Sequence, residues 1–340
     1  MLASCLFAVA LVTAASTLGG AGGCARAPAR PATSTGDAYP SRPLRLIVPF
    51  PAGGGADFWG RLLASKLTET LGEPVVVDDV PGMGGNTGTA AAARAPADGY
   101  TLLLGSTGPL AVHPFTYDTL PFDPDEDFVP VALLESSPIV LVVHPSVHAS
   151  SLSELVALAK TRPGGLTFAS NGNGSPEEIA GALFDRRLGL EIRHVPFDGA
   201  GPARSELAKG GVSMMFDPCK AALPAIQRGK ERALAVASEA RLGSLPDVPT
   251  FGDVGLRDFE LRIWTGVLAP KGTPPDAVAA LSRAIREALD TPDMRKAMAD
   301  QGSEPGCTSP EGFAELLRSE RARWKRLVAE SGVATVRGPI

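Results

Sequence analysis

The segment "PFPAGGGADFWGR", Pro49–Arg61, places three consecutive glycines between an apolar run and an amphipathic helical pattern. The preceding "LRLIVPF" has the composition of a strand, and Leu63, Leu67 and Leu71 then recur every four residues until Gly72 ends the pattern. A glycine-rich turn between a strand and a helix brings backbone N–H groups close to an anion. The Lys of a Walker-type nucleotide loop is absent. The segment therefore predicts a site that holds an anion with backbone dipoles.

Short apolar runs alternate with helical patterns from Tyr39 onward, which indicates an α/β fold with parallel sheets covered on both faces. About ten strand-like runs exceed what one compact sheet usually contains. We therefore expect two lobes, each a mostly parallel sheet flanked by helices, with crossovers in loops near Leu133–Pro138 and Gly255–Arg262. The predicted division is an export signal and tether in 1–38, a discontinuous first lobe in 39–137 plus 262–340, and a second lobe in 138–261.

The composition excludes some classes of function. The chain has 340 residues, 44% of them hydrophobic and 20% charged, which is typical of a soluble globular protein. Its net charge of −5 gives no electrostatic footprint for nucleic acid. The 3 Trp and 3 Tyr residues also argue against a platform on which bases stack.

The N-terminal residues have the features of an export signal. "LFAVALVTAASTLGGAGG", Leu6–Gly23, carries no charge and ends in small residues before Cys24. Two alternatives remain open: lipidation of Cys24 after cleavage, or ordinary signal-peptide cleavage. Residues 25–38 are rich in Pro, Ala and Thr and predict a disordered tether. We therefore expect a periplasmic protein, in which Cys219 and Cys307 either form a disulfide or remain separate thiols.

Small polar segments follow several predicted strands and precede predicted helices. Ligands of open α/β sheets bind at this edge, where the first turn of each helix has unpaired N–H groups. Together these loops favour a carboxylate held by amides, hydroxyls and helix N-termini. The segments are Gly53–Asp57, Gly82–Gly88, Ser106–Gly108 and Ser170–Ser175.

Motifs for cofactors, metals and catalysis are lacking. "GMGGNTG" departs from the dinucleotide pattern because Thr87 stands where its last glycine belongs. His144 and His148 are separated by a proline that breaks any helix aligning them as metal ligands. "LGSTG" is not a nucleophile elbow, and His194 is interpreted as a packed or strand-end histidine. We expect no cofactor, no metal and no enzymatic activity.

Longer motifs resemble a known family. "YPSRPLRLIVPFPAGGGADFWGRLLASKL", "VVVDDVPGMGGNTGTAAAARAPADGYTLLLGS", "FASNGNGSPEEIAGALF" and "WTGVLAPKGTP" occur in the order found in the substrate-binding receptors of tripartite tricarboxylate transporters, the Bug-type receptors. The likeness covers residues 39–332. It implies a two-lobed periplasmic clamshell of the type II binding-protein class, which closes on an organic acid by hinge rotation. It also implies a monomer that delivers its ligand to one large and one small membrane subunit.

The family's ligand carboxylate is held by the loop after the first strand, through backbone amides and bridging waters. Carried over position by position, the resemblance assigns further contacts to strand-end residues of both lobes. The predicted ligand-binding residues are Phe50, Gly53, Gly54, Gly55, Asp57, Ser106, Thr107, Ser170, Asn171, Asn173, Ser175, Gly199, Gly201 and Asp217.

Two departures from the family leave the ligand open. Pro176, Glu177 and Glu178 stand where many relatives have a polar residue and a His, and Phe197–Gly201 lacks the cation and hydroxyl of the common Y-K-G-S-G. Asp217 could then face an ammonium or amide group. A monocarboxylate, an amino acid or a neutral-ended acid therefore competes with a C4-dicarboxylate. An extracytoplasmic sensor subunit that docks a signalling partner is the alternative function.

Overall fold

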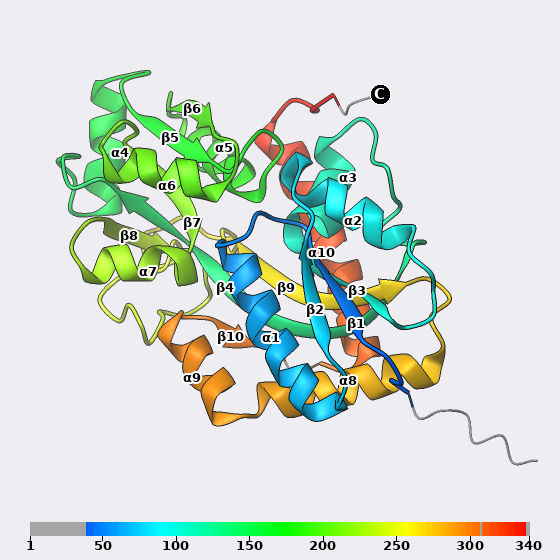
Figure 1. Ribbon diagram of the computed structural model, residues 1–340. Helices are drawn as coiled ribbons and strands as arrows, with labels where there is room; N and C mark the ends of the chain where they lie inside the picture. Colours follow the sequence, from blue (N-terminus) through cyan, green and yellow to red (C-terminus); the bar gives the residue numbers. More distant parts are fainter. Residues whose placement is uncertain (1–38, 307, 338–340) are drawn as a thin grey trace, which may run out of the picture. The chain divides into compact units, whose positions relative to one another are not determined.

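The structure is a computed structural model that describes residues 39–306 and 308–337. Its first group of strands has the order β2-β1-β3-β9-β4 (Figure 1). The three strands β2, β1 and β3 are parallel, whereas β9 is antiparallel to both β3 and β4. The bounds are β1 Leu44–Val48, β2 Val75–Asp79, β3 Thr101–Ser106, β4 Phe128–Val143 and β9 Arg262–Pro270, and the short β10, Glu304–Pro305, also pairs with β4.

The same sheet continues through β4 into a second group of strands. There β7 and β8 are antiparallel to β4, while β5 is parallel to both β6 and β7. The predicted parallel pairing therefore holds toward the two outer parts of the sheet, and antiparallel pairs surround β4. The bounds are β5 Thr167–Ser170, β6 Arg193–Pro196, β7 Met214–Pro218 and β8 Arg232–Val236.

Strand β4 corrects one expectation. The segment Leu133–Pro138, predicted as a crossover loop, lies inside this continuous 16-residue strand. Phe128–Pro138 pairs with β9 and Ile139–Val143 pairs with β7, so one strand serves both groups. Two register shifts against β9 let the strand bend and change partners without a loop. The second expected crossover agrees better, because irregular turns precede β9.

The first group of strands is buried on both faces. Successive side chains of a strand point to opposite faces, so Leu46 and Val48 pack with Trp59 and Leu63 while Ile47 packs on the other side. One face is covered by α1 Gly55–Leu71, α8 Pro275–Leu289 and α9 Pro292–Asp300. The other is covered by α2 Asn86–Ala93, which follows η1 Met83–Gly85, and by η2 Gly108–Val112, α3 His113–Thr116 and α10 Pro310–Ser331.

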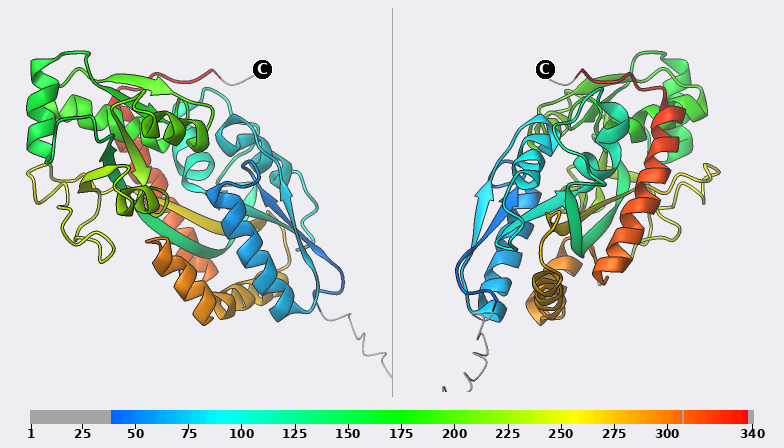
Figure 2. Two further views of the ribbon diagram at one scale, coloured as in Figure 1. Left: turned by 60° about the vertical axis from the view of Figure 1, so that its left-hand side comes forward. Right: turned by 90° about the vertical axis from the view of Figure 1, so that its right-hand side faces the viewer.

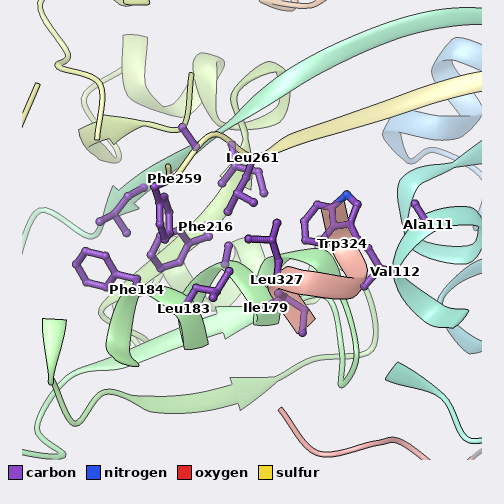
Figure 3. Close-up of a cluster of buried hydrophobic side chains, with 14 of the residues drawn as sticks. Ala111, Val112, Ile179, Leu183, Phe184, Phe216, Phe259, Leu261, Trp324 and Leu327 are labelled. Carbon is purple, nitrogen blue, oxygen red and sulfur yellow. The ribbon is translucent and has the colours of Figure 1, made fainter. Parts of the chain in front are cut away.

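The second group is also covered on both faces. α4 Leu152–Thr161 and α5 Pro176–Leu188 share one core cluster, whereas α6 Ala200–Ala208 and α7 Cys219–Gln227 share another. Figure 2 shows α10 running from beside the second group along the first. Its Trp324 and Leu327 lie beside Ile179 and Leu183 of α5 and Val112 of η2 (Figure 3). The C-terminal helix therefore packs against both groups of strands.

Candidate functional site

The first glycine loop ends in a helix start without a side-chain cap. Gly54 is the N-cap of α1 and has no side chain with which to accept an N–H bond. Gly53 has a φ of +79°, a value that favours glycine, and its N–H donates to Asp57 Oδ2 at 2.7 Å. The glycines Gly53–Gly55 are exposed, so the N–H groups of the first helical turn can meet a ligand.

Asp57 is held by protein partners. It is buried, and its second oxygen lies 2.6 Å from Nε of Arg61, whose Nη2 donates to Asp79 Oδ2 at 2.7 Å. Burial, followed by the nearby Asp57 carboxylate, raises the pKa of Asp79. The Arg61 guanidinium thus pairs with two carboxylates. Asp57 shapes the loop from inside, and direct contact between Asp57 and a ligand stays a prediction.

The next loop packs against Phe50 and His113. A Cβ added to Gly84 would lie 3.0 Å from His113 Cε1, and one added to Gly85 would lie 3.0 Å from Phe50 Cζ. Both glycines also have positive φ values. His113 Nδ1 lies 2.7 Å from Asn86 Oδ1, and burial lowers the pKa of His113 to about 3. The imidazole is therefore neutral, and its Nδ1–H donates to Asn86.

The end of β3 contributes two hydroxyls with different surroundings. The Ser106 oxygen is buried and has no hydrogen-bond partner among the described residues. Thr107 is fully buried, accepts the Trp264 N–H at 2.8 Å and donates to the Trp264 carbonyl at 3.4 Å. Ser106 thus stays a candidate for contact with a ligand, whereas Thr107 joins the end of β3 to β9. Asn86 Nδ2 is likewise buried and unpartnered within the described part of the chain.

The loop after β5 is built around His194. Ser170 Oγ lies 2.7 Å from His194 Nε2, and Glu178 Oε1 lies 3.2 Å from His194 Nδ1. Glu178 Oε2 accepts the N–H of Gly174, and Ser175 Oγ caps α5 by accepting the Glu178 N–H at 3.3 Å. Ser170 and Ser175 are therefore engaged within the protein. Asn171, whose Oδ1 is unpartnered among the described residues, and the exposed Asn173 are the polar side chains left for a ligand.

The sequence motifs did not reveal this Ser–His–Glu arrangement. Its connectivity is that of a hydrolytic triad. However, Ser170 is fully buried, and its oxygen already accepts the Gly172 N–H at 3.2 Å. The contacts therefore hold the loop around a Ser170 hydroxyl that is buried and already hydrogen-bonded.

Contacts through α3 join the two sets of loops. Thr116 Oγ1 donates to the Gly174 carbonyl at 3.1 Å, and the rings of His113 and Tyr117 are 4.8 Å apart. The loop after β6 joins the same region, because Phe197 N donates to Ser170 O at 3.1 Å. Strand-end segments from both groups therefore lie together, as the ligand-site prediction requires.

The remaining predicted residues lie around α6. Gly199 is its N-cap, with a φ of 96° and no side-chain cap, and Gly201 is exposed in its first turn. Asp217 is buried and accepts two bonds from Arg204, at 2.7 and 2.8 Å. Asp217 therefore faces an arginine of its own chain, and its contact with an ammonium or amide of a ligand stays a prediction. No motif indicated Arg204, because only the fold brings α6 to the end of β7.

The two best-defined pockets among the described residues lie away from these loops. One, of about 530 Å³, is at the amino ends of β1 and β3 and includes Arg42, Asp98 and Tyr100. The other, of about 480 Å³, lies beside α10 and includes Glu260 and Arg323. Neither contains a predicted ligand residue.

Other predictions concern metals, membranes and cysteines. The described residues contain no group of three or more His, Cys, Asp and Glu side chains suited to a metal, and no helix in them could cross a membrane. Cys219 is a buried free thiol whose pKa is raised to about 11 by burial. Cys24 and Cys307 lie outside the described residues, so lipidation and the disulfide remain predictions.

Comparisons with known proteins agree with this architecture. Residues 60–333 match the family model described as the tripartite tricarboxylate transporter family receptor. BugT from Bordetella pertussis is 41% identical over 297 residues, which cover 87% of this chain and 91% of BugT. The structure of R. palustris Rpa4515 with adipate has a TM-score of 0.84 and 33% identity, covering 88% of this chain and 100% of that one. The periplasmic binding protein BugD has a TM-score of 0.81 and 32% identity, with the same coverage.

Proposed function

Since this chain belongs to the tripartite tricarboxylate transporter receptor family, we propose that it captures a small organic acid and delivers it to a membrane transporter with one large and one small subunit. Members of the family are periplasmic substrate-binding receptors. The chain has the predicted α/β fold of type II periplasmic binding proteins. In this role the protein binds and releases the acid without changing it chemically.

The open start of α1 carries the proposal. Gly54 supplies no cap, so the first-turn N–H groups and the positive end of the helix dipole remain available to a carboxylate. The unpartnered hydroxyl of Ser106 lies at the end of the neighbouring parallel strand β3. Parallel strands end at one edge of the sheet, so both donors serve one site.

The second group of strands supplies the opposite wall of the site in this proposal. α6 also starts at an uncapped glycine, and Asn171 and Asn173 lie in the loop after β5. Rotation about β4, which both groups share, would close the two walls on the ligand. The two-lobe division at 39–137 plus 262–340 and 138–261 is part of the proposal.

Charge near the site favours capture by dipoles. Arg61 pairs with Asp57 and Asp79, and Arg204 pairs with Asp217, so both guanidinium groups already have carboxylate partners within the chain. Several dipoles with bridging waters give affinity without an ion pair that is costly to desolvate. Rpa4515 was solved with adipate, a dicarboxylate. We propose the carboxylate class for this chain and keep monocarboxylates, amino acids and neutral-ended acids as candidates beside dicarboxylates.

A thermal-shift screen tests the proposal. The purified protein would be heated with adipate, malate, citrate, hexanoate, aspartate and nicotinate at equal ionic strength. A ligand that binds the folded state raises the melting temperature by mass action. We expect a concentration-dependent rise with at least one of these acids and no loss of the acid on incubation. No response to any carboxylate would contradict the assignment, and turnover of an acid would indicate an enzyme.

A further inference from the structure

We propose that His194 is a positioning residue that makes ligand capture depend on pH, by ordering the loop Ser170–Ser175 when its imidazole is protonated. This inference rests on the proposed function, because the loop forms one wall of the proposed site. The contacts that carry it belong to the ligand-free protein and can be measured separately.

Both nitrogens of His194 have partners from other segments. Nδ1 lies 3.2 Å from Glu178 Oε1 on α5, and Nε2 lies 2.7 Å from Ser170 Oγ at the end of β5. The ring stacks on Phe168 of β5 with centroids 4.8 Å apart, and its side chain is only 20% exposed. The imidazole is therefore fixed in place and connects three elements.

The hydrogens in this network can be counted. Ser170 has one hydroxyl hydrogen, and its oxygen lies 2.7 Å from His194 Nε2 and 3.1 Å from the Gly172 carbonyl. If His194 is neutral and donates from Nδ1 to Glu178, its bare Nε2 needs that hydrogen, and the Gly172 carbonyl loses its donor. If His194 is protonated, Nε2–H donates to Ser170, and Ser170 donates to Gly172. If His194 is neutral with its hydrogen on Nε2, the bonds to Ser170 and Gly172 are kept, but the bare Nδ1 then faces the Glu178 carboxylate at 3.2 Å. Only the protonated ring places an N–H toward both Ser170 and Glu178.

Charge favours the same state. Glu178 on α5 is the charged group in contact with the ring, and β5 contributes only Phe168 and Ser170. Tyr117, which follows α3, lies close enough for the Glu178 charge to raise its pKa, after the larger effect of burial. A protonated His194 thus adds an ion pair to Glu178 while Glu178 Oε2 still accepts the Gly174 N–H.

The ordered loop matters because it contacts the other wall. Thr116 Oγ1 of α3 donates to the Gly174 carbonyl at 3.1 Å. This hydrogen bond connects the two groups of strands, and it forms only while Gly174 keeps its position. Asn171 and Asn173 lie in the same loop and move with it. Protonation of His194 should therefore order the loop and also raise the affinity for a ligand.

Three variants separate positioning from folding. His194→Phe keeps a ring to stack on Phe168 but removes both nitrogens. Glu178→Gln keeps an acceptor for the Gly174 N–H but removes the charge that favours a protonated imidazole. His148→Phe is the matched control, because His148 is an exposed histidine outside the network.

Hydrogen exchange of the ligand-free full-length protein gives the first readout. Protection factors of residues 168–178, corrected for intrinsic exchange, would be compared at pH 6 and pH 8. We expect about threefold to tenfold more protection at pH 6 in the wild type and the control, from one or two added hydrogen bonds. The change should vanish in His194→Phe and shrink in Glu178→Gln.

Calorimetric titration with hexanoate, adipate and malate gives the second readout, with the control correcting for titration of the acids. The affinity of the best of them should rise by a similar factor at pH 6, except in His194→Phe. The inference would be overturned if protection in the wild type were the same at pH 6 and pH 8, or if His194→Phe showed the same pH response as the wild type. Binding of none of these acids would count against the proposed function, and the exchange data would still decide the role of His194.

Discussion

Asp57 binds the N–H of Gly53 and the guanidinium of Arg61, and so prepares a ligand loop from behind it. A buried carboxylate needs such partners, because leaving it unpaired would cost several kcal/mol. The contacts of Asp57 give it a supporting role in the loop, and the ligand contact that the resemblance assigns to it stays a prediction. At the scale of single residues, the candidate donors for a carboxylate near this loop are backbone N–H groups, the hydroxyl of Ser106 and Nδ2 of Asn86.

Replacing Gly54 with Leu tests these donors. Gly54 has an ordinary φ of −84°, and an added Cβ would meet only the Pro51 carbonyl, at 3.3 Å, so we expect the protein to fold. The side chain would cover the start of α1 and abolish the thermal shift with the best acid. Gly243→Leu is the control, since a Cβ there meets nothing within 4 Å. A full response in Gly54→Leu would show that the ligand lies elsewhere.

Glu177 provides a second test at this scale. Burial raises its pKa to about 7, and the nearby Asp217 adds to the effect. The folded protein therefore holds this proton up to higher pH than the unfolded chain, and stability falls as pH rises from about 4.5 to 7. We expect Glu177→Gln to match the wild type at pH 5 and to exceed it by about 1–3 kcal/mol at pH 8. Urea unfolding of both proteins at pH 5 and pH 8 measures this. A difference in unfolding free energy between variant and wild type that is the same at both pH values would contradict the prediction.

At the scale of elements, β4 changes partners around a buried ion pair. Glu135 is fully buried on this strand, pairs with Lys220 of α7 and accepts a bond from Ser303 at 3.0 Å. The Lys220 N–H also donates to Ser137 Oγ at 3.1 Å. These bonds hold α7 and the turn before β10 to the middle of β4, where the strand leaves β9 for β7.

Removing one partner of this pair should be costly. Lys220→Met leaves Glu135 without its counter-charge, so we expect a loss of about 3–5 kcal/mol in unfolding free energy. Adding Glu135→Leu should recover much of that loss, because the double variant buries no unpaired charge. Lys296→Met, which breaks the exposed pair with Asp300, is the control and should change stability by less than about 1 kcal/mol. Chemical denaturation measures all three, and an unaffected Lys220→Met would contradict the argument.

At the scale of the whole described unit, α10 joins the two groups of strands. Trp324 and Leu327 belong to a cluster that also contains Ile179 and Leu183 of α5 and Leu103 of β3. Arg187 at the end of α5 adds two bonds to Glu330 of α10, at 2.6 and 2.9 Å. Any rotation of one group against the other must therefore pivot close to α10 and β4.

This shared core predicts cooperative unfolding. Leu327→Ala removes a side chain that is 2% exposed, and we expect a loss of about 2–5 kcal/mol. Far-ultraviolet circular dichroism and tryptophan fluorescence should still report one coincident transition, because both groups depend on the same cluster. Two separate transitions would show that the groups fold independently and that α10 does not couple them.

Local patterns in the sequence predicted an α/β fold, the glycine turns and the strand-end loops, because turn chemistry and apolar spacing act over a few residues. The type II class came from the family resemblance. They did not predict that β4 is continuous, since its partners β7, β8 and β9 are remote in sequence. The partners of Thr107, Asp217 and His194 were missed for the same reason: Trp264, Arg204 and Glu178 come from other elements. A buried polar group takes whatever partner the fold brings within about 3 Å, so tertiary contacts decided which of the predicted residues are hydrogen-bonded within the protein.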